Sequence, residues 1–433
     1  MEQTYHSVRL EKSRCTGCTT CLKKCPTEAI RIRGGRAHII DGQCIDCGEC
    51  IRVCPHHAKV AVTDPLESIK AFKYKIALPA PALYGQFKNL RSINRVLTAL
   101  KTLGFDTVFE VARGADIVSR AIIEKMKNTR LIRPVISSAC PAIVRLIRVR
   151  FPDLIDNLVD VRQPMEVAAL VARSEFCHQY GVDPADVGCF FITPCPAKMT
   201  AIRSPIGHEK SAMNGAISIV EIYAQLTQVM RSADLKEEPL NEATMFGVGW
   251  ARSGGEANAI GQTNSLAVDG IDHVIRVLEE IENNRLNDLD FFEGLACTGG
   301  CVGGPLTLEN NYVAKSNIRR LMEGMEKVRP EHKVAPSAMN KYPIYNTLPI
   351  TPSNVMRLDD NIIEAMRKME RIEQVTRELP GYDCGSCGSP SCRTLAEDIE
   401  AGYAGEMDCI YRLRDRLKVM AQQMVELSEQ ERK

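Results

Sequence analysis

Between residues 66 and 345, short apolar runs alternate with segments that carry a helical spacing of apolar positions. The runs predict strands at 74–79, 107–111, 132–137 and 187–193, and the helical segments span 92–102, 117–127, 142–150 and 166–180. Alternation of this kind is typical of parallel sheets covered by helices. Cys140 and Cys195 each follow a predicted strand, where open α/β sheets place their ligands.

The segment after residue 345 has a different pattern. An amphipathic helix is predicted over 354–379, ended by Pro380 and Gly381, and its apolar positions are Val355, Leu358, Ile362, Met366, Met369, Ile372 and Val375. A last helix has apolar residues at alternating spacings of 3 and 4, namely Ile410, Leu413, Leu417, Met420, Met424 and Leu427. This short heptad seam has three interpretations. The helix packs on its own domain, it joins two copies of the chain as a homodimer, or it is the remnant of a connection to an output domain.

Two cysteine runs near the N-terminus share one spacing. Cys15-x2-Cys18-x2-Cys21-x3-Cys25-Pro26 is repeated as Cys44-x2-Cys47-x2-Cys50-x3-Cys54-Pro55. In this bacterial ferredoxin run the fourth cysteine of each run binds the other cluster. One [4Fe–4S] cluster is therefore assigned to Cys15, Cys18, Cys21 and Cys54, and the other to Cys44, Cys47, Cys50 and Cys25. The alternative is a pair of zinc sites, which usually space their ligands as two CxxC pairs. Short strands predicted at 29–32 and 37–40 suit a ferredoxin-like unit.

A third cysteine set lies between the two C-terminal helices. Cys384-x2-Cys387-x4-Cys392-x16-Cys409 is rich in glycine and serine and resembles a small [4Fe–4S] domain found in other redox proteins. Zinc is the competing metal, because four cysteines at this spacing do not choose between the two.

Charge and composition narrow the class of protein. The chain has 433 residues, with 55 Lys and Arg against 54 Asp and Glu, a formal charge of +1. We expect no nucleic-acid or membrane partner, because no broad basic field, membrane-length apolar run or signal peptide is present. A cytoplasmic location is expected, where the 18 cysteines are poor candidates for disulfides. Only Cys177 and Cys189 remain outside the assigned sets, as buried thiols.

Four further cysteines stand in unusual backbone settings. Cys140 and Cys195 each adjoin prolines, and Cys297 and Cys301 lie four apart in a glycine-rich run that extends from 293 to 305. Glycines let backbone N–H groups approach a bulky anionic group closely. The pattern predicts one cluster held where several loops meet.

Here the sequence resembles the [FeFe]-hydrogenase family. Ser137-Ser138-Ala139-Cys140-Pro141, Thr193-Pro194-Cys195-Pro196-Ala197-Lys198 and the 293–305 run are similar to its three signature loops, in the same order. The resemblance implies an H-cluster, a [4Fe–4S] cubane joined to a di-iron subsite with CO, cyanide and a dithiolate bridge. It implies cubane ligation by Cys140, Cys195, Cys297 and Cys301, with Cys301 as the bridge. It also implies that Lys198 donates to a cyanide ligand and that Ala80, Pro81 and Met165 line the di-iron pocket.

Several positions depart from the family pattern. Ala139 stands where catalytic members have a proton-relaying cysteine, and a methyl group cannot carry a proton. Thr193 and Leu295 replace two methionines, Ala201 replaces a glutamate, and Met165 replaces a glutamine in a stretch that reads Gln163-Pro164-Met165-Glu166. In this respect the chain resembles the sensory subtype of the family.

The predicted function is slow H2 oxidation and evolution at an H-cluster, with electron transfer through [4Fe–4S] clusters, in an H2 or redox sensor. The alternatives are a fully catalytic, ferredoxin-linked hydrogenase and an iron–sulfur assembly or scaffold protein that lacks the di-iron subsite. The partners implied are H2 and protons, a ferredoxin-like electron partner or a signalling protein, maturation proteins, and a second copy of the chain.

The predicted architecture is α/β. A ferredoxin-like domain with two [4Fe–4S] clusters spans residues 1–65, and a two-lobed α/β iron-hydrogenase domain spans 66–345. A helical linker (346–380), a small helical [4Fe–4S] domain (381–409) and the heptad helix (410–433) follow.

Overall fold

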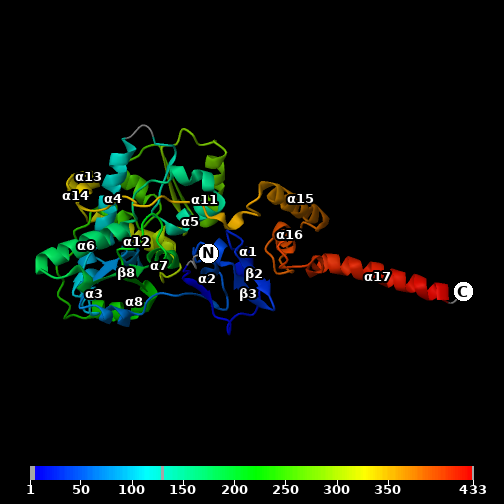
Figure 1. The fold of residues 1–433 in the computed structure, drawn as a ribbon. Coiled ribbons are helices and arrows are strands. Elements are labelled where there is room, and N and C mark those ends of the chain that lie inside the picture. Colours follow the sequence, from blue (N-terminus) through cyan, green and yellow to red (C-terminus); the bar gives the residue numbers. More distant parts are fainter. Residues whose placement is uncertain (1–4, 128–130, 432–433) are drawn as a thin grey trace. The chain divides into compact units, whose positions relative to one another are not determined.

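The computed structural model describes residues 5–127 and 131–431, which form two compact units. The first contains Met1–Val8, Ile45–Gly48 and Ala61–Ser353, and the second contains Arg9–Cys44, Glu49–Val60 and Asn354–Lys433. Figure 1 shows their elements. Among the described residues no helix is both long and apolar enough to cross a membrane.

The first unit contains a four-stranded parallel sheet in the order β6-β5-β8-β9. Its strands are β5 (Tyr74–Pro79), β6 (Thr107–Val108), β8 (Val187–Thr193) and β9 (Gly215–Ser218). All seven residues of β8 are buried, as expected for a strand covered on both faces. The predicted bounds of β5 and β8 are confirmed. The prediction for β6 was too long, because the chain enters the next helix at Val111.

A second parallel sheet in the same unit has the order β10-β11-β7. Its strands are β7 (Val135–Ile136), β10 (Ser265–Asp269) and β11 (Phe291–Leu295). The prediction of a strand over 132–137 was too long. Pro134 has no N–H to give to a neighbouring strand, so the ladder begins only after it.

Helices cover these sheets and enclose the main apolar core. The four predicted ones are present as α3 (Ile93–Lys101), α4 (Val111–Met126), α5 (Pro141–Arg150) and α6 (Pro164–Tyr180). The others are α7 (Pro196–Arg203), α8 (Ile219–Arg231), α9 (Met245–Gly249), α10 (Gly255–Ile260), α11 (Ile271–Glu282), α12 (Asn311–Glu323), α13 (Pro330–Lys333) and α14 (Ala338–Lys341).

The second unit begins with a small ferredoxin-like head. Its strands β2 (Ile30–Arg33) and β3 (Arg36–Ile39) form an antiparallel hairpin close to the predicted positions. The short helices α1 (Thr20–Lys23) and α2 (Glu49–Arg52) pack together, and Leu22 fills the core beside them. Strands β1 (Val8–Leu10) and β4 (Lys59–Ala61) form a further two-stranded sheet.

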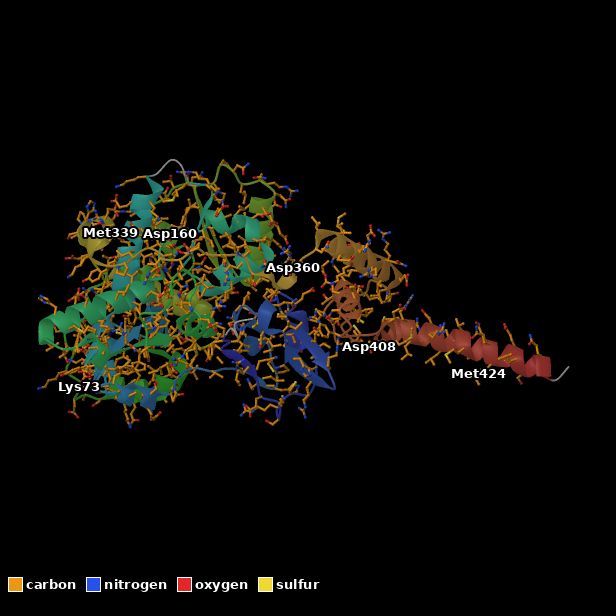
Figure 2. The ribbon with its side chains drawn as sticks, in the orientation of Figure 1. Lys73, Asp160, Met339, Asp360, Asp408 and Met424 are labelled. Carbon is orange, nitrogen blue, oxygen red and sulfur yellow. The ribbon has the colours of Figure 1, made fainter. Side chains whose placement is uncertain are left out.

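Three helices complete the second unit: α15 (Ile362–Glu378), α16 (Cys392–Glu400) and α17 (Ile410–Glu431). The predicted start of α15 at 354 was wrong. Asn361 caps the helix by accepting from the N–H of Ile363 at 2.9 Å, and the chain before it is irregular except for a short turn. The apolar seam of α17 is exposed along its length, as the labelled Met424 in Figure 2 illustrates. The α/β class with parallel sheets is confirmed.

Candidate metal centre

The three loops that resemble the family signature follow the carboxyl ends of three parallel strands. The first follows β7 at Ser137, the second begins at Thr193, the last residue of β8, and the third follows β11 after Leu295. Ligand crevices in open α/β sheets lie at this edge of the strands. The two sheets of the first unit therefore direct their loops to a common place.

The four loop cysteines line one cavity of about 90 Å³ in the first unit. They are Cys140, Cys195, Cys297 and Cys301. Most of the other lining residues are apolar, so a group bound here would be shielded from water. The convergence expected from the sequence is therefore present in the fold.

Two of these cysteines cap helices. Cys140 is the N-cap of α5 and Cys195 is the N-cap of α7, and a proline follows each at the first helical position. Helix N-termini favour negative charge because their first N–H groups have no partner within the helix. Both positions thus suit a thiolate that binds an anionic cluster.

Burial opposes ionisation of the free thiols. Loss of water raises the pKa of Cys195 to about 11 and that of Cys301 to about 12, and the neighbouring thiols add to the effect. Lys198 works in the opposite direction on both. A metal cluster would have to displace the thiol protons, which is the usual coupling between metal binding and pKa.

Lys198, the predicted cyanide donor, lies on the first turn of α7 and lines the cavity. Its ammonium donates to the carbonyl of Ala139 at 2.9 Å and to Oε1 of Gln163 at 2.9 Å. Burial lowers the pKa of Lys198, and the nearby thiols Cys301, Cys140 and Cys195 oppose this. The side chain is therefore fixed beside the cysteines and is no ordinary surface lysine. Gln163 had not been singled out from the sequence.

The other predicted pocket residues lie on the same cavity. Ala80, Pro81, Ala139 and Met165 all line it, and so does Leu295. Ala139 presents a methyl group and a carbonyl that is already bonded to Lys198, so it offers the cavity no exchangeable proton.

Two buried glutamates also line the cavity and were missed as candidates. Glu293 accepts from the N–H of Gly254 at 3.0 Å and of Ala257 at 2.9 Å, at the N-terminal end of α10. Glu256 on α10 accepts from the hydroxyl of Ser137 at 2.5 Å, while its Oε1 finds no hydrogen-bond partner among the described residues.

Burial raises the pKa of both carboxyl groups, and their mutual repulsion raises that of Glu256 further. Two such groups so close together hold a proton to higher pH than free glutamates do. Glu293 is the first residue of the glycine-rich run 293–305, so the sequence offered a signal that could have identified it as a candidate. Glu256 has no comparable motif around it.

One cysteine of the ferredoxin runs also reaches this cavity. Cys47 lines it, and the next residue, Gly48, packs against the second and third loops. A Cβ on Gly48 would lie 2.5 Å from Pro305 and 3.0 Å from Pro196, and its φ of +77° also favours glycine. A predicted cluster ligand, Cys47, thus lies next to the candidate centre.

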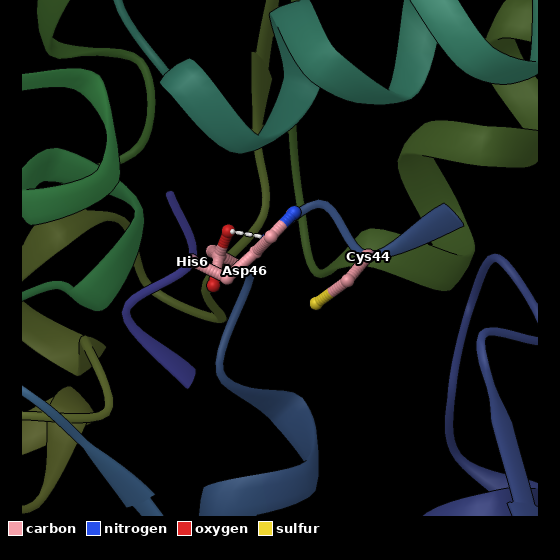
Figure 3. Close-up of side chains that lie close together, drawn as sticks. All are labelled: His6, Cys44 and Asp46. Atoms are coloured by element: carbon pink, nitrogen blue, oxygen red, sulfur yellow. Dashed lines mark hydrogen bonds and ion pairs between the residues drawn. The ribbon is translucent and has the colours of Figure 1, made fainter. Parts of the chain in front are cut away.

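The Cys47 segment is held by a buried histidine–aspartate contact, shown in Figure 3. Nδ1 of His6 lies 2.7 Å from Oδ2 of Asp46, and Oδ1 of Asp46 accepts from the N–H of Val8 at 2.9 Å. Neither residue had been singled out from the sequence. Their contact fixes the loop next to Cys47 within the first unit.

The remaining ferredoxin cysteines belong to the second unit. Cys15, Cys18 and Cys54 lie close enough to Cys21 to raise the pKa of its thiol, after the larger effect of burial. This brings one predicted ligand set together. Of the other set, Cys25 and Cys50 pack on the core beside Leu22, and Cys44 ends a short turn after β3.

The C-terminal cysteines also converge. Cys387, Cys392 and Cys409 share the small core under α15, and Cys384 and Cys409 are near enough to Cys387 to raise the pKa of its thiol, again after burial. The two cysteines outside the sets behave differently: Cys189 is fully buried in β8, and Cys177 is only partly buried on α6.

The residues present fit an iron–sulfur cluster in the cavity. Four thiols of the required kind share it, two at helix N-termini, and the glycine-rich loop permits close backbone contacts. A Cβ on Gly304 would lie 2.3 Å from the carbonyl oxygen of Pro194, and Gly300 has a φ of +95°. A larger residue at either position would displace the cysteine loop.

Family models match most of the chain. The family described as "Iron only hydrogenase large subunit, C-terminal domain" matches residues 73–265 and 261–305. The family described as "4Fe-4S dicluster domain" matches residues 7–55, and the family described as "Putative Fe-S cluster" matches residues 379–411. The last match favours iron over zinc at the C-terminal cysteines.

Among relatives, Iron hydrogenase 1 of Clostridium pasteurianum is 23% identical over 407 residues, covering 77% of this chain and 70% of the relative. The periplasmic [Fe] hydrogenase large subunit of Nitratidesulfovibrio vulgaris is 29% identical over 212 residues, covering 45% of this chain and 50% of the relative. A solved variant of the [FeFe]-hydrogenase HydA1 from Chlamydomonas reinhardtii has a TM-score of 0.49 at 16% identity, covering 65% of this chain and 92% of that one.

The first of these family models covers more than half of the chain and includes all four cysteines of the cavity. Two further models account for the cysteine sets at either end of the chain. With iron–sulfur clusters supported in all three regions, the protein belongs to the [FeFe]-hydrogenase family.

Proposed function

We propose that this protein is a hydrogen-responsive member of the family, which reacts with H2 slowly and passes its redox state to a partner as a sensor. Family membership supports H2 and protons as the substrates and iron–sulfur clusters as the electron carriers. The sensor role and the slow turnover are the parts that we add.

Four cysteines would hold the cubane of an H-cluster: Cys140, Cys195, Cys297 and Cys301. Cys301 would bridge to the di-iron subsite, which supplies, when bound, the metal at which H2 is split. The ammonium of Lys198 would orient that subsite through a cyanide ligand, a charge-assisted contact that is strong in a dry pocket. The apolar lining, Met165 included, would exclude water.

The observation that carries the proposal is Ala139 on the wall of this cavity. The cysteine expected there would pass protons, whereas a methyl group can neither donate nor accept one. Loss of a positioned acid–base group typically lowers the rate by about 10²–10⁴. A centre that keeps its ligands but lacks this group binds H2 and turns over slowly, as a sensor requires.

Substitution at this position tests the proposal. In protein matured with the di-iron cofactor, Ala139→Cys should raise the rate of H2 oxidation by at least about tenfold, because a thiol restores an acid–base group beside the cofactor. Ala139→Ser is the matched control, since its hydroxyl group is similar in size to the thiol of cysteine but is a much weaker acid. Wild-type turnover equal to that of a good hydrogenase would overturn the sensory proposal.

A second candidate function is a fully catalytic hydrogenase with a different proton route. The contact between Glu256 and Ser137 favours it, because Glu256 lines the cavity with an oxygen that has no partner in the described part of the chain, and burial raises the pKa of its carboxyl group. The carboxyl could receive or donate a proton at Oε1, and the Ser137 hydroxyl would orient Oε2. Steady turnover with a ferredoxin-like acceptor would favour this candidate.

Several parts of the proposal concern partners. We keep a ferredoxin-like electron partner or a signalling protein, maturation proteins that insert the di-iron subsite, a homodimer, and a cytoplasmic location as predictions. The third candidate is an assembly or scaffold protein without the di-iron subsite. In such a protein Lys198 would have no cyanide ligand to contact.

A further inference from the structure

The C-terminal four-cysteine module (residues 381–409) packs directly on the ferredoxin-like head within the second unit. The N–H of Ile32 in β2 donates to the carbonyl of Gly388 at 2.8 Å, so the cysteine loop is bonded to the strand. Gly388 has a φ of +81°, and a Cβ there would lie 2.0 Å from the carbonyl oxygen of Ile32. Only glycine permits so close an approach at this backbone conformation.

A buried carboxylate fixes this contact. Asp398 of α16 accepts from Nε of Arg31 at 2.7 Å and from Arg33 at 3.0 Å. The same oxygen accepts from the hydroxyl of Ser389 at 2.7 Å. The side chains of Arg31 and Asp398 are almost fully buried. Removing one partner of such a group would leave an uncompensated buried charge, so the module is held in one position on the head.

Two cationic side chains of the head reach the cysteine loop itself. Arg33 donates to the carbonyl of Cys387 at 3.0 Å, and Nζ of Lys23 donates to the carbonyl of Pro390 at 2.8 Å. Nζ of Lys23 would also lie 3.5 Å from a Cβ at Gly385, within the loop. Asp398 neutralises part of the charge of Arg33, whereas the part of the chain that the structure describes offers Lys23 no ion pair.

We propose that the cluster of the C-terminal module exchanges electrons with the ferredoxin-type clusters of the head on which the module is docked. Lys23 raises the reduction potential of the module's cluster. Each exchange oxidises one ferredoxin-type cluster by one electron and reduces the C-terminal cluster by one, and no bond forms or breaks. A nearby positive charge stabilises the reduced, more negative cluster. Only the source of the electrons, the oxidation of H2, rests on the proposed function.

The docking is tested in the full chain with its [4Fe–4S] clusters but without the di-iron cofactor, so that hydrogen turnover plays no part. After reduction with dithionite, the electron paramagnetic resonance spectrum should show magnetic coupling between the C-terminal cluster and the ferredoxin-type clusters. Cys384→Ala should remove the C-terminal signal together with that coupling. A wild-type spectrum without this coupling, or one unchanged by the substitution, would overturn the proposal.

The role of Lys23 is tested in folded protein by redox titration of the same signal. Lys23→Met should shift the midpoint potential of the C-terminal cluster to lower values. Lys24→Met is the matched control, because Lys24 is the adjacent exposed lysine and makes no hydrogen bond or ion pair with the described residues of the module. Since solvent screens part of the charge on Lys23, the shift should shrink at high salt. Equal potentials in the two variants would overturn this role.

Discussion

At the scale of single residues, the cavity combines four cysteines with an alanine, Ala139, at the position where the family resemblance leads us to expect a proton-relaying cysteine. Its four cysteines could be found from the sequence, because cysteine beside proline or within a glycine-rich run is rare enough to be informative. Gln163 and Glu256 could not be found in this way. Both act through contacts with residues far away in sequence, Lys198 and Ser137, which no local pattern reveals.

Glu256 gives a pH-dependent prediction. Burial and the charge of Glu293 raise its pKa, so the carboxyl stays protonated at pH values where a free glutamate has ionised, and it loses the proton as pH rises through the raised value. If its neutral form donates the proton, H2 evolution should decline over that window. Glu256→Gln keeps a partner for Ser137 but removes the titration.

The measurement is the rate of H2 evolution across neutral pH. At low pH, H2 evolution by Glu256→Gln should be slower than in the wild type by about 10²-fold or more. The rate of this variant should not decline as the pH rises through the raised pKa of Glu256. Glu397→Gln is a control, since this glutamate on α16 belongs to the second unit and its pKa is also raised by burial. An unchanged pH profile in Glu256→Gln would show that the proton travels elsewhere.

At the scale of elements, two buried strands were predicted at their observed bounds, whereas the starts of two helices, α4 and α15, were missed by several residues. The bounds of β5 and β8 follow from continuous apolar runs, whereas α4 begins at Val111, well before the predicted 117. Gly114 lowers the helical signal there, since glycine is a poor helix former. Its reason is tertiary: a Cβ at Gly114 would lie 2.3 Å from the carbonyl oxygen of Pro164, at the start of α6.

This close contact between α4 and α6 gives a stability prediction. Gly114→Ala should destabilise the protein by about 1–3 kcal/mol, because the added methyl group forces the two helices apart. Gly324→Ala, next to the end of α12, is the matched control, since its Cβ would meet only ordinary contacts at 3.7 Å. The check is the midpoint of thermal unfolding, and equal midpoints for the two variants would contradict the packing argument.

At the scale of the whole molecule, α17 exposes a seam of apolar residues at heptad spacing. Its apolar residues at heptad positions lie on the surface, including Met424, which is 70% exposed. Most of the stability of a helix in a protein comes from packing of its apolar face, so a partner on this seam would stabilise α17. The heptad spacing suits a second copy of the same helix, which supports the predicted homodimer.

Charges placed in this seam should abolish the dimer. Leu417→Lys combined with Met424→Lys would bury like charges between the two copies, and the mass measured by light scattering should fall to that of a monomer. Gln422→Lys is the control, because this residue lies outside the heptad positions. A wild-type protein that is already monomeric at micromolar concentration would contradict the homodimer.

The grouping of the cysteines was largely predictable at this scale, because their spacing identifies each set. The docking of the C-terminal module on the ferredoxin-like head was not predictable. It depends on Arg31, Arg33 and Asp398, which look like ordinary surface charges in the sequence and become a buried network only in the fold. Long-range charge pairing leaves no periodic signal.

The most direct test of the central claim is infrared spectroscopy of the protein after incubation with the di-iron cofactor. We predict bands from CO and cyanide ligands, and their loss in Cys301→Ala, the variant without the bridging thiolate. A spectrum of the wild-type protein without such bands, under conditions that load a known [FeFe]-hydrogenase, would contradict an H-cluster in this cavity.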